Sequence, residues 1–277
     1  MLNCYTPVVA PRHDDGRSKR RDRGEKAANG DANTTSQPRL ATAAVARVDG
    51  RAPYDMRQVY MDVGVVAHAT GSAYVEFNHT KVICAVYGPH AQTGRDSSFS
   101  EEGQLKCDFS YAPFATPGGR RDSRGGKRDD ERELSTLLRQ TLESSVQVHR
   151  LTKSVVDIHV MVLQADGGQL AVATTCASMA LADAGIELYD LVTSCSVGYS
   201  GTQMVLDPTH AEEKNGAGVM AIALMPGSQL VTQWWQEGRF NGEEVAEALE
   251  LCTDGCSCVH KMMVAKLKAA AASRKDK

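Results

Sequence analysis

The segment Gln164-Ala165-Asp166-Gly167-Gly168 separates an apolar stretch from an alanine-rich one and is a candidate ligand site. Two adjacent glycines let the backbone approach a ligand closely, and the free N–H groups at the start of a following helix favour an anion. A tight turn between a strand and a helix, however, needs glycine for its φ angles even without a ligand. Taken by themselves, these residues favour the tight turn.

Near the end of the chain, four residues could ligate a metal: Cys252, Cys256, Cys258 and His260. Structural zinc sites usually combine closely paired cysteines with a second pair of ligands. Here the spacing differs from C-x2-C, no second pair follows, and apolar neighbours surround the cysteines. We therefore favour packing within a helix over metal binding and expect no bound metal.

The elements that would position these residues follow from the hydrophobic pattern. Short β-rich or apolar runs that end at turn residues predict strands, whereas apolar residues at helical spacing predict helices. We expect strands at residues 73–77, 80–87, 155–163, 194–199, 219–224 and 230–235, and helices at residues 131–149, 170–184 and 242–272. Strands that alternate with helices in this way are typical of a mixed α/β domain.

Composition narrows the class of protein. The chain has 277 residues, a formal net charge of −3 and 42% hydrophobic residues, as expected of a globular protein. No run approaches about 18 apolar residues, so we expect no membrane-spanning helix. The first residues lack the apolar core of a signal peptide, which favours a reducing compartment. The near-neutral charge argues against a surface that binds nucleic acid throughout.

The two ends differ from the rest of the chain. Residues 1–47 contain nine Lys or Arg and five Asp or Glu, a difference of +4, and few large apolar residues after Val9. We expect this basic tail to be disordered, and its Arg17–Arg23 cluster is either a nuclear-import or RNA-contacting patch or simply solvated. The domain is expected to span residues 48–272, followed by a short charged C-terminus at 273–277.

A second basic segment lies between Pro117 and Arg128. One acid, Asp122, and four glycines accompany its cations, which are Arg120, Arg121, Arg124, Lys127 and Arg128. Such a glycine-rich loop can contact an RNA backbone without reading its sequence, and Phe114 nearby could stack on a base. The alternative is an ordinary surface loop, whose positive electrostatic potential is reduced by the acids at 129–131. We favour RNA contact slightly.

Most of the chain resembles the RNase PH family of phosphorolytic exoribonucleases and their exosome relatives. The resemblance covers residues 48–268 and rests on motifs in the family's order: Val48-Asp49-Gly50-Arg51, Gly71-Ser72-Ala73-Tyr74-Val75-Glu76, Thr80-Lys81-Val82, Gly88-Pro89, Leu163-Gln164-Ala165-Asp166-Gly167-Gly168 and Leu181-Ala182-Asp183-Ala184-Gly185-Ile186. It implies a single α/β domain built from βαβ units.

More narrowly, five motifs resemble the mRNA-transport-regulator-three type of eukaryotic exosome subunit: Cys107-Asp108-Phe109, Ala112-Pro113-Phe114-Ala115, Glu131-Arg132-Glu133-Leu134, Tyr189-Asp190-Leu191-Val192 and Leu206-Asp207-Pro208-Thr209. This resemblance implies a heterohexameric ring of RNase PH-like subunits, RNA-binding cap subunits, and single-stranded RNA in a central channel. It also implies location in the nucleus, nucleolus and cytoplasm, with no membrane partner.

Active members of the family use phosphate to cleave the last phosphodiester of RNA, and the resemblance implies where phosphate would bind. Their Gly-Gly turn is followed by Thr-Arg, whereas this chain has Gln169-Leu170 after Gly167-Gly168. A leucine cannot balance the charge of a phosphate. The position of a second phosphate-binding arginine in the family corresponds to Asp130 in this chain. An acid there would repel the anion unless Arg132 or Arg128 took the place of the missing arginine.

The acidic half of the implied site is retained. Two family aspartates, six residues apart, correspond to Asp207 and Glu213, which could bind Mg²⁺ or act as a general acid. Because the phosphate-binding half is missing, we favour acids on a solvated turn and expect neither metal nor cofactor.

The sequence thus predicts a non-catalytic exosome ring subunit. The main alternative is an active phosphate-dependent exoribonuclease, alone or with a partner subunit, which would use Mg²⁺. A third reading is a self-contained protein that binds a small ligand. The Trp234-Trp235 pair, on an expected strand, is better explained by buried packing or a subunit interface than by RNA stacking.

Overall fold

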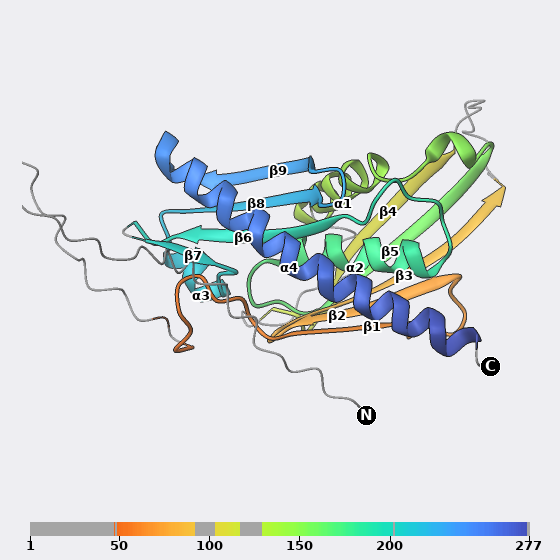
Figure 1. Cartoon of the computed structure of the whole chain (residues 1–277), viewed down its shortest axis with the longest axis horizontal. Helices are drawn as coiled ribbons and strands as arrows, with labels where there is room; N and C mark the ends of the chain where they lie inside the picture. The colour runs from red at the N-terminus through yellow and green to blue at the C-terminus, as the bar shows by residue number, and fades with distance from the viewer. Residues whose placement is uncertain (1–46, 48, 92–102, 117–128, 202, 276–277) are drawn as a thin grey trace, which may run out of the picture.

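The computed structural model describes residues 47, 49–91, 103–116, 129–201 and 203–275, which form two β-sheets and four α-helices (Figure 1). The first sheet has the strand order β1-β2-β3-β5-β4. Its strands are β1 (Val59–Val63), β2 (Gly71–Phe77), β3 (Thr80–Ala91), β4 (Gln104–Tyr111) and β5 (Ser154–Gln164). Neighbouring strands are antiparallel, except that β4 and β5 are parallel.

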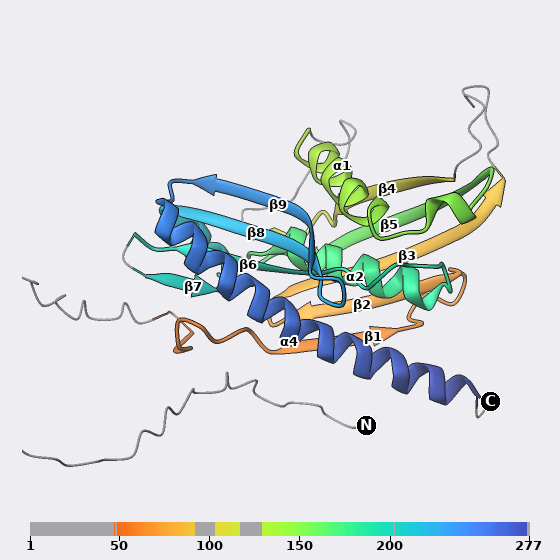
Figure 2. The same ribbon diagram turned by 45° about the horizontal axis from the view of Figure 1, so that its top comes forward.

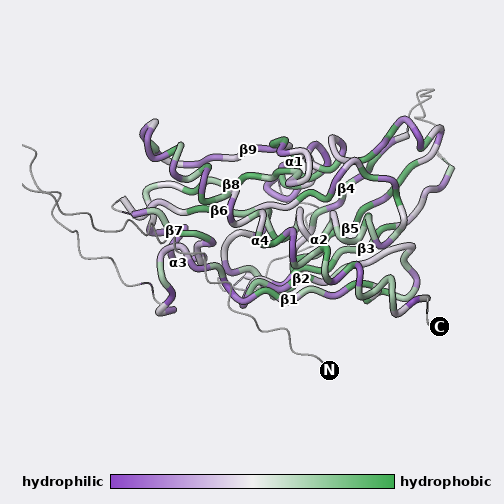
Figure 3. The backbone as a smooth tube through the Cα atoms, viewed as in Figure 1, coloured by the Kyte–Doolittle hydropathy of each residue, from purple (hydrophilic) through white to green (hydrophobic). Residues whose placement is uncertain are grey.

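Helix α1 (Asp129–Glu143) connects the parallel strands β4 and β5, which makes β4-α1-β5 a βαβ unit. The second sheet is antiparallel with the order β7-β6-β8-β9. Its strands are β6 (Thr193–Tyr199), β7 (Met204–Leu206), β8 (Gly218–Met225) and β9 (Leu230–Gly238). The short helix α3 (His210–Asn215) lies between β7 and β8 and is markedly hydrophilic (Figure 3).

Helix α2 (Gln169–Asp183) contacts both sheets, through β2 and β3 of the first and β6 of the second. Its residues from Ala171 to Leu181 are all buried, because alanine, serine and threonine side chains are small enough for strands to approach on several sides. Helix α2 therefore joins the two sheets through their cores. The turn that precedes it lies where both sheets meet.

Helix α4 (Gly242–Lys275) crosses both sheets (Figure 2). Its first half contributes Cys252 and Cys256 to the core of the second sheet. Its second half contributes Val259 and Met263 to the larger core around the first sheet. One amphipathic helix therefore covers part of each core.

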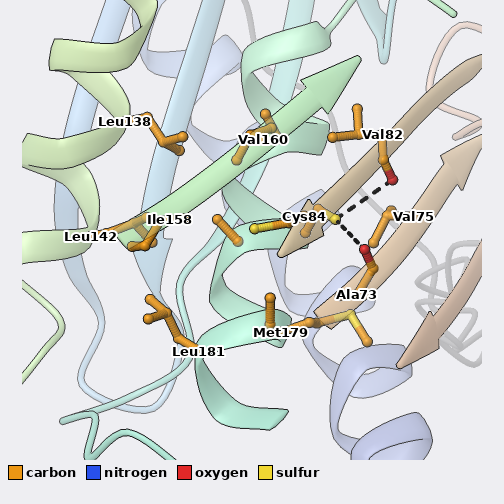
Figure 4. Close-up of a cluster of buried hydrophobic side chains, with 14 of the residues drawn as sticks. Ala73, Val75, Val82, Cys84, Leu138, Leu142, Ile158, Val160, Met179 and Leu181 are labelled. Carbon is orange, nitrogen blue, oxygen red and sulfur yellow. Dashed lines mark hydrogen bonds between the residues drawn. The ribbon is translucent and has the colours of Figure 1, made fainter. Parts of the chain in front are cut away.

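The larger core lies between the first sheet and helices α1 and α2. Leu138 and Leu142 of α1 face Ile158 of β5 in this layer, and all three are fully buried (Figure 4). On the other side, the Cys176 thiol of α2 lies 3.3 Å from the carbonyl oxygen of Ala73. The buried thiol therefore donates a weak hydrogen bond to the backbone within the apolar core.

The expected strands and the helices at 170–184 and 242–272 are confirmed, and the mixed α/β class with them. The pair of strands at 73–77 and 80–87 is an antiparallel hairpin that turns at Asn78-His79. The strand at 155–163 and those at 194–199, 219–224 and 230–235 correspond to β5, β6, β8 and β9. The cluster Cys252, Cys256 and Cys258 lies on α4, as the favoured interpretation held.

Three expectations need correction. The helix expected at 131–149 ends at Glu143, and Val146 instead forms an isolated bridge with Leu188. The strand expected to end before Gly88 continues to Ala91 with a shifted register. Arg47, assigned to the tail, is buried in the domain. Strands β1, β4 and β7 and helix α3 were not predicted.

Residues 1–46 and the basic segment 117–128 lie outside the described residues, so the structure does not test the predicted disorder or the predicted RNA-binding loop. In the described part of the chain, no helix combines the length and apolar character needed to cross a membrane.

Candidate functional site

The Gly-Gly turn packs directly against the segment that follows β7. Gly167 and Gly168 both have positive φ, at 81° and 62°. A Cβ on Gly167 would lie 2.5 Å from the carbonyl oxygen of Pro208, closer than van der Waals contact allows. These glycines are therefore required by backbone conformation and by close packing, as the tight-turn interpretation held.

Asp207 lies beside this turn and is bound by an arginine that the sequence analysis did not identify. Arg57 donates two hydrogen bonds from its guanidinium to the Asp207 carboxylate, at 2.8 and 2.5 Å, and a third from its backbone N–H at 3.1 Å. Both side chains are almost fully buried. Asp207 also has a φ of 52°, a conformation rare for a residue other than glycine.

The same guanidinium fixes the turn itself. Arg57 donates to the carbonyl oxygens of Asp166 at 2.6 Å and Gly167 at 3.2 Å, and to the hydroxyl oxygen of Thr80 at 3.0 Å. Burial by itself would raise the pKa of Asp207, yet the charge and hydrogen bonds of Arg57 hold it below its ordinary value. Asp207 is therefore an ionised structural partner of Arg57.

Glu213, on α3, reaches back to the start of α2. Its carboxylate accepts a hydrogen bond of 2.7 Å from the backbone N–H of Gly168, the N-cap residue of α2. Free N–H groups at a helix start are the groups that attract anions. The chain thus places its own carboxyl group at this turn.

The surroundings of Glu213 resist its ionisation. Burial raises the pKa of Glu213 to about 7, although the Gly168 N–H and Arg57 act in the opposite direction. The nearby carboxylates Asp207 and Asp166 add to the rise. Glu213 thus changes charge near neutral pH, whereas Asp207 stays ionised.

Glu212, the neighbour of Glu213, has a separate structural role. It forms a capping box with Thr209 at the start of α3 and an ion pair of 2.9 Å with buried Arg47. Arg47 also donates to the backbone oxygens of Leu206 and Asp207, at 3.0 Å each. Neither Arg47 nor Arg57 stands in a recognisable motif, so only the fold could reveal these partners.

Gln169 and Leu170, which replace the family's Thr-Arg pair, open onto a cavity of about 520 Å³. Leu134 of α1 and Trp235 of β9 provide apolar walls, and Lys214 and His210 lie at its border. Ser196 also lines the cavity, and its hydroxyl oxygen is buried without a hydrogen-bond partner in the described part of the chain. The cavity thus has one lysine but no arginine among its described lining residues.

Asp130 lies in the exposed first turn of α1, and Arg132 pairs with Asp129 at 3.1 Å. Phe114 is 74% exposed and lines a second cavity of about 620 Å³, which Gln164, Ala165 and Asp166 at the approach to the Gly-Gly turn also line. The five cations Arg120, Arg121, Arg124, Lys127 and Arg128 lie outside the described residues.

Burial raises the pKa values of the Cys252 and Cys256 thiols, which is unfavourable for metal-binding thiolates. Across the described ranges, no group of three or more His, Cys, Asp or Glu side chains is placed to hold a metal ion. The expectation of no metal or cofactor for the whole chain remains a prediction.

Two sequence profiles match most of the chain. Residues 55–187 match domain 1 and residues 190–255 match domain 2 of the 3′ exoribonuclease family, RNase PH. The chain belongs to the RNase PH family. The boundary between the two profiles falls between α2 and β6, so the site combines Arg57 and the Gly-Gly turn from the first part with Asp207 and Glu213 from the second.

Members of this family from several organisms are similar over most of their length. An "Exosome complex component RRP41-like" of Arabidopsis thaliana is 36% identical over 82% of this chain and 86% of its own. "Exosome complex component Rrp41" of Pyrobaculum calidifontis is 37% identical over 80% of this chain and 89% of its own. "Exosome complex component RRP41" of Homo sapiens is 35% identical over 78% and 88%.

Solved RNase PH-type structures share the fold. Rice (Oryza sativa) Rrp46 superposes with a TM-score of 0.70 and 22% identity, covering 80% of this chain and all of that one. A chain of the "archaeoglobus fulgidus exosome with RNA bound to the active site" superposes with a TM-score of 0.68 and 20% identity. The match covers 78% of this chain and 92% of that one. The narrower mRNA-transport-regulator-three type stays a prediction.

Proposed function

We propose that this chain is a non-catalytic ring subunit of the RNA exosome that supports 3′-to-5′ RNA processing and degradation. In this role it forms part of a channel, contacts single-stranded RNA and binds neighbouring RNase PH-like subunits and cap subunits. The exosome names of its relatives, at 34–37% identity, support the assembly. We extend the proposal to the nucleus, nucleolus and cytoplasm, as the sequence resemblance implied.

The observation that carries the non-catalytic part of the proposal is the hydrogen bond from the Gly168 N–H to Glu213. A phosphate at the start of α2 would need this N–H group and a cation beside it. The N–H is already bound by a carboxylate, and the position expected for the arginine is Leu170. An incoming phosphate would meet a like charge above about pH 7, where Glu213 is ionised.

The acidic pair is also poorly suited to hold Mg²⁺. Both carboxylate oxygens of Asp207 accept hydrogen bonds from Arg57, and the guanidinium would repel a divalent cation. This arrangement supports a function that does not use Mg²⁺. Arg57 and Asp207 instead hold together the two parts of the domain.

The experiment is an assay for phosphorolysis. Purified chain, alone and in its assembled complex, is incubated with single-stranded RNA, Mg²⁺ and phosphate, and nucleoside diphosphates are measured by chromatography. We expect no phosphate-dependent release from this chain. For a complex that contains other RNases, the same complex is prepared with the Glu213→Gln variant, and we expect an unchanged rate.

Phosphate-dependent release by the purified chain that both Asp207→Ala and Glu213→Gln abolish would establish the alternative, an active exoribonuclease. Asp207→Ala breaks a buried ion pair and can unfold the protein. Glu213→Gln is therefore tested as well, because glutamine has nearly the same size and shape as glutamate. Asp254→Asn, an exposed residue on α4, is the control that should leave every rate unchanged.

A further inference from the structure

Strand β9 forms the outer edge of the second sheet and runs along one margin of the molecule (Figures 1 and 2). In the described part of the chain, β8 is its only strand partner. Three of its apolar side chains are largely exposed: Leu230 by 57%, Val231 by 51% and Trp234 by 46%. Trp234 is thus too exposed for buried packing, and the subunit-interface alternative stays a prediction.

The other sheet edges carry features that discourage strand pairing. Strand β1 is covered by α4, whose Lys266 pairs with Asp62 at 3.2 Å and lies over the ring of Tyr60. Strand β4 carries the charged Lys106 and Asp108, and β7 has only three residues. Charge, coverage and shortness are the usual protections of edge strands.

Strand β9 has neither charge nor a covering helix over most of its length, although its register against β8 shifts at Thr232. Its nine residues contain no proline, and the first charged one is Glu237, near its end. Helix α1 contacts only part of it, where Thr141 bonds to Gln233. Among the described residues no strand other than β8 pairs with β9, so its outer backbone edge suits an added strand from another chain.

The residue pattern disfavours a second copy of this chain as that strand. Antiparallel pairing of β9 with itself about Trp234 would place Glu237 opposite Val231 and Gly238 opposite Leu230. Directly opposite residues decide much of the stability of a strand pair, and these pairs match poorly. A different strand, apolar opposite Leu230–Trp234 and basic opposite Glu237, would match.

We propose that β9 is the docking edge for an extended strand of a neighbouring RNase PH-type subunit. The inference rests on the proposed function, because it identifies the surface through which this chain joins its ring. Trp234 and Val231 would then be buried in the assembly, with Glu237 paired to a lysine or arginine of the neighbour.

The first test is a charge variant of the edge. The double variant Val231→Lys and Trp234→Lys is mixed with the organism's other RNase PH-type exosome subunits, and assembly is measured by analytical ultracentrifugation. We expect the affinity to fall at least about tenfold, since two charges would be buried without partners. The matched control is Val65→Lys and Met161→Lys, two apolar residues outside the second sheet that are exposed by 46% and 45%, which should assemble normally.

Hydrogen exchange of the unmodified chain provides a measurement that does not depend on a variant folding. In the assembled complex, the amides of β9 that do not face β8 should exchange at least about tenfold more slowly than in the free chain. Unchanged exchange across residues 230–238, or normal assembly by the folded β9 variant, would overturn the inference. So would a homodimer of the free chain that the β9 variant disrupts. Failure of the unmodified chain to assemble at all would instead count against the proposed function.

Discussion

Glu213 and Glu212 are adjacent on α3, yet their surroundings shift their pKa values in opposite directions. Burial dominates at Glu213 and raises its pKa to about 7. At Glu212, burial also acts to raise the pKa, but hydrogen bonds from Arg47 and the Thr209 N–H bring it below its ordinary value. The pair therefore offers a test in which one variant controls for the other.

Glu213→Gln should stabilise the protein at pH 8. The folded pKa lies above the ordinary value of 4.5, so the folded state holds a proton that the unfolded state has lost, and stability falls as pH rises toward about 7. Glutamine keeps the acceptor for the Gly168 N–H but does not titrate. Each pKa unit corresponds to about 1.4 kcal/mol, so we expect the free energy of unfolding at pH 8 to be about 1–3 kcal/mol higher in the variant. This gain should vanish near pH 4.5. Urea denaturation at several pH values measures this.

Glu212→Gln should lower the free energy of unfolding at pH 8. A carboxylate whose pKa is lowered in the folded state stabilises the fold at pH values above its ordinary pKa, and glutamine loses this contribution. The same urea series provides the control. If both variants changed stability in the same direction at pH 8, the assignment of the two environments would be wrong.

At the scale of the element, α4 joins two cores. At 34 residues and 1.5 Å per residue, it is about 50 Å long. Its first half packs on the second sheet and its second half on the first. A helix in that position should couple the stability of both sheets.

Met263→Ala tests the contact of α4 with the larger core. Met263 is fully buried, so its truncation should leave a cavity and cost about 2–5 kcal/mol of unfolding free energy. The exposed Lys268→Ala on the same helix should change it by less than about 0.5 kcal/mol. Equal effects of the two variants in guanidinium denaturation would show that the second half of α4 does not dock.

The hydrophobic pattern predicted the buried helices and strands well, because the spacing of apolar residues indicates which face of an element packs against the core. It predicted α2 and β5 within one residue at each end, since both are surrounded by apolar neighbours. It missed β1, whose residues are mostly half-exposed, and it extended α1 past Glu143, because Val146 continues the helical spacing while pairing with Leu188. Tertiary contacts decided both cases.

The site was predictable only in part. The Gly-Gly turn and Asp207 stood in motifs, and the departure at Gln169 and Leu170 was visible in the sequence. The partner of Asp207 was not, because Arg57 lies 150 residues away in the chain. The expectation of a solvated turn was wrong for Asp207, which is buried with its partner.

At the scale of the whole molecule, a net charge of −3 conceals the basic segment at 117–128. Replacing Arg120, Arg121, Arg124, Lys127 and Arg128 by serine should weaken binding of the assembled complex to single-stranded RNA. If each cation contacts a phosphate, the slope of log affinity against log salt should fall by up to about 3.5, at about 0.7 per contact. Fluorescence anisotropy at several salt concentrations measures it. The exposed α4 residues Lys261→Ser and Lys268→Ser are the control, and an unchanged slope in the five-residue variant would exclude RNA contact by this segment.

The central claim is that the chain's own carboxylate and leucine have replaced the phosphate site. Titration calorimetry with orthophosphate at pH 7.5 tests it most directly, using the unmodified protein and the triple variant Gln169→Thr, Leu170→Arg and Glu213→Asp. We expect no measurable binding by the unmodified protein and a dissociation constant of about 1 mM or lower, a binding free energy near −4 kcal/mol, for the triple variant. Binding of phosphate by the unmodified protein at about 1 mM or tighter would overturn the claim.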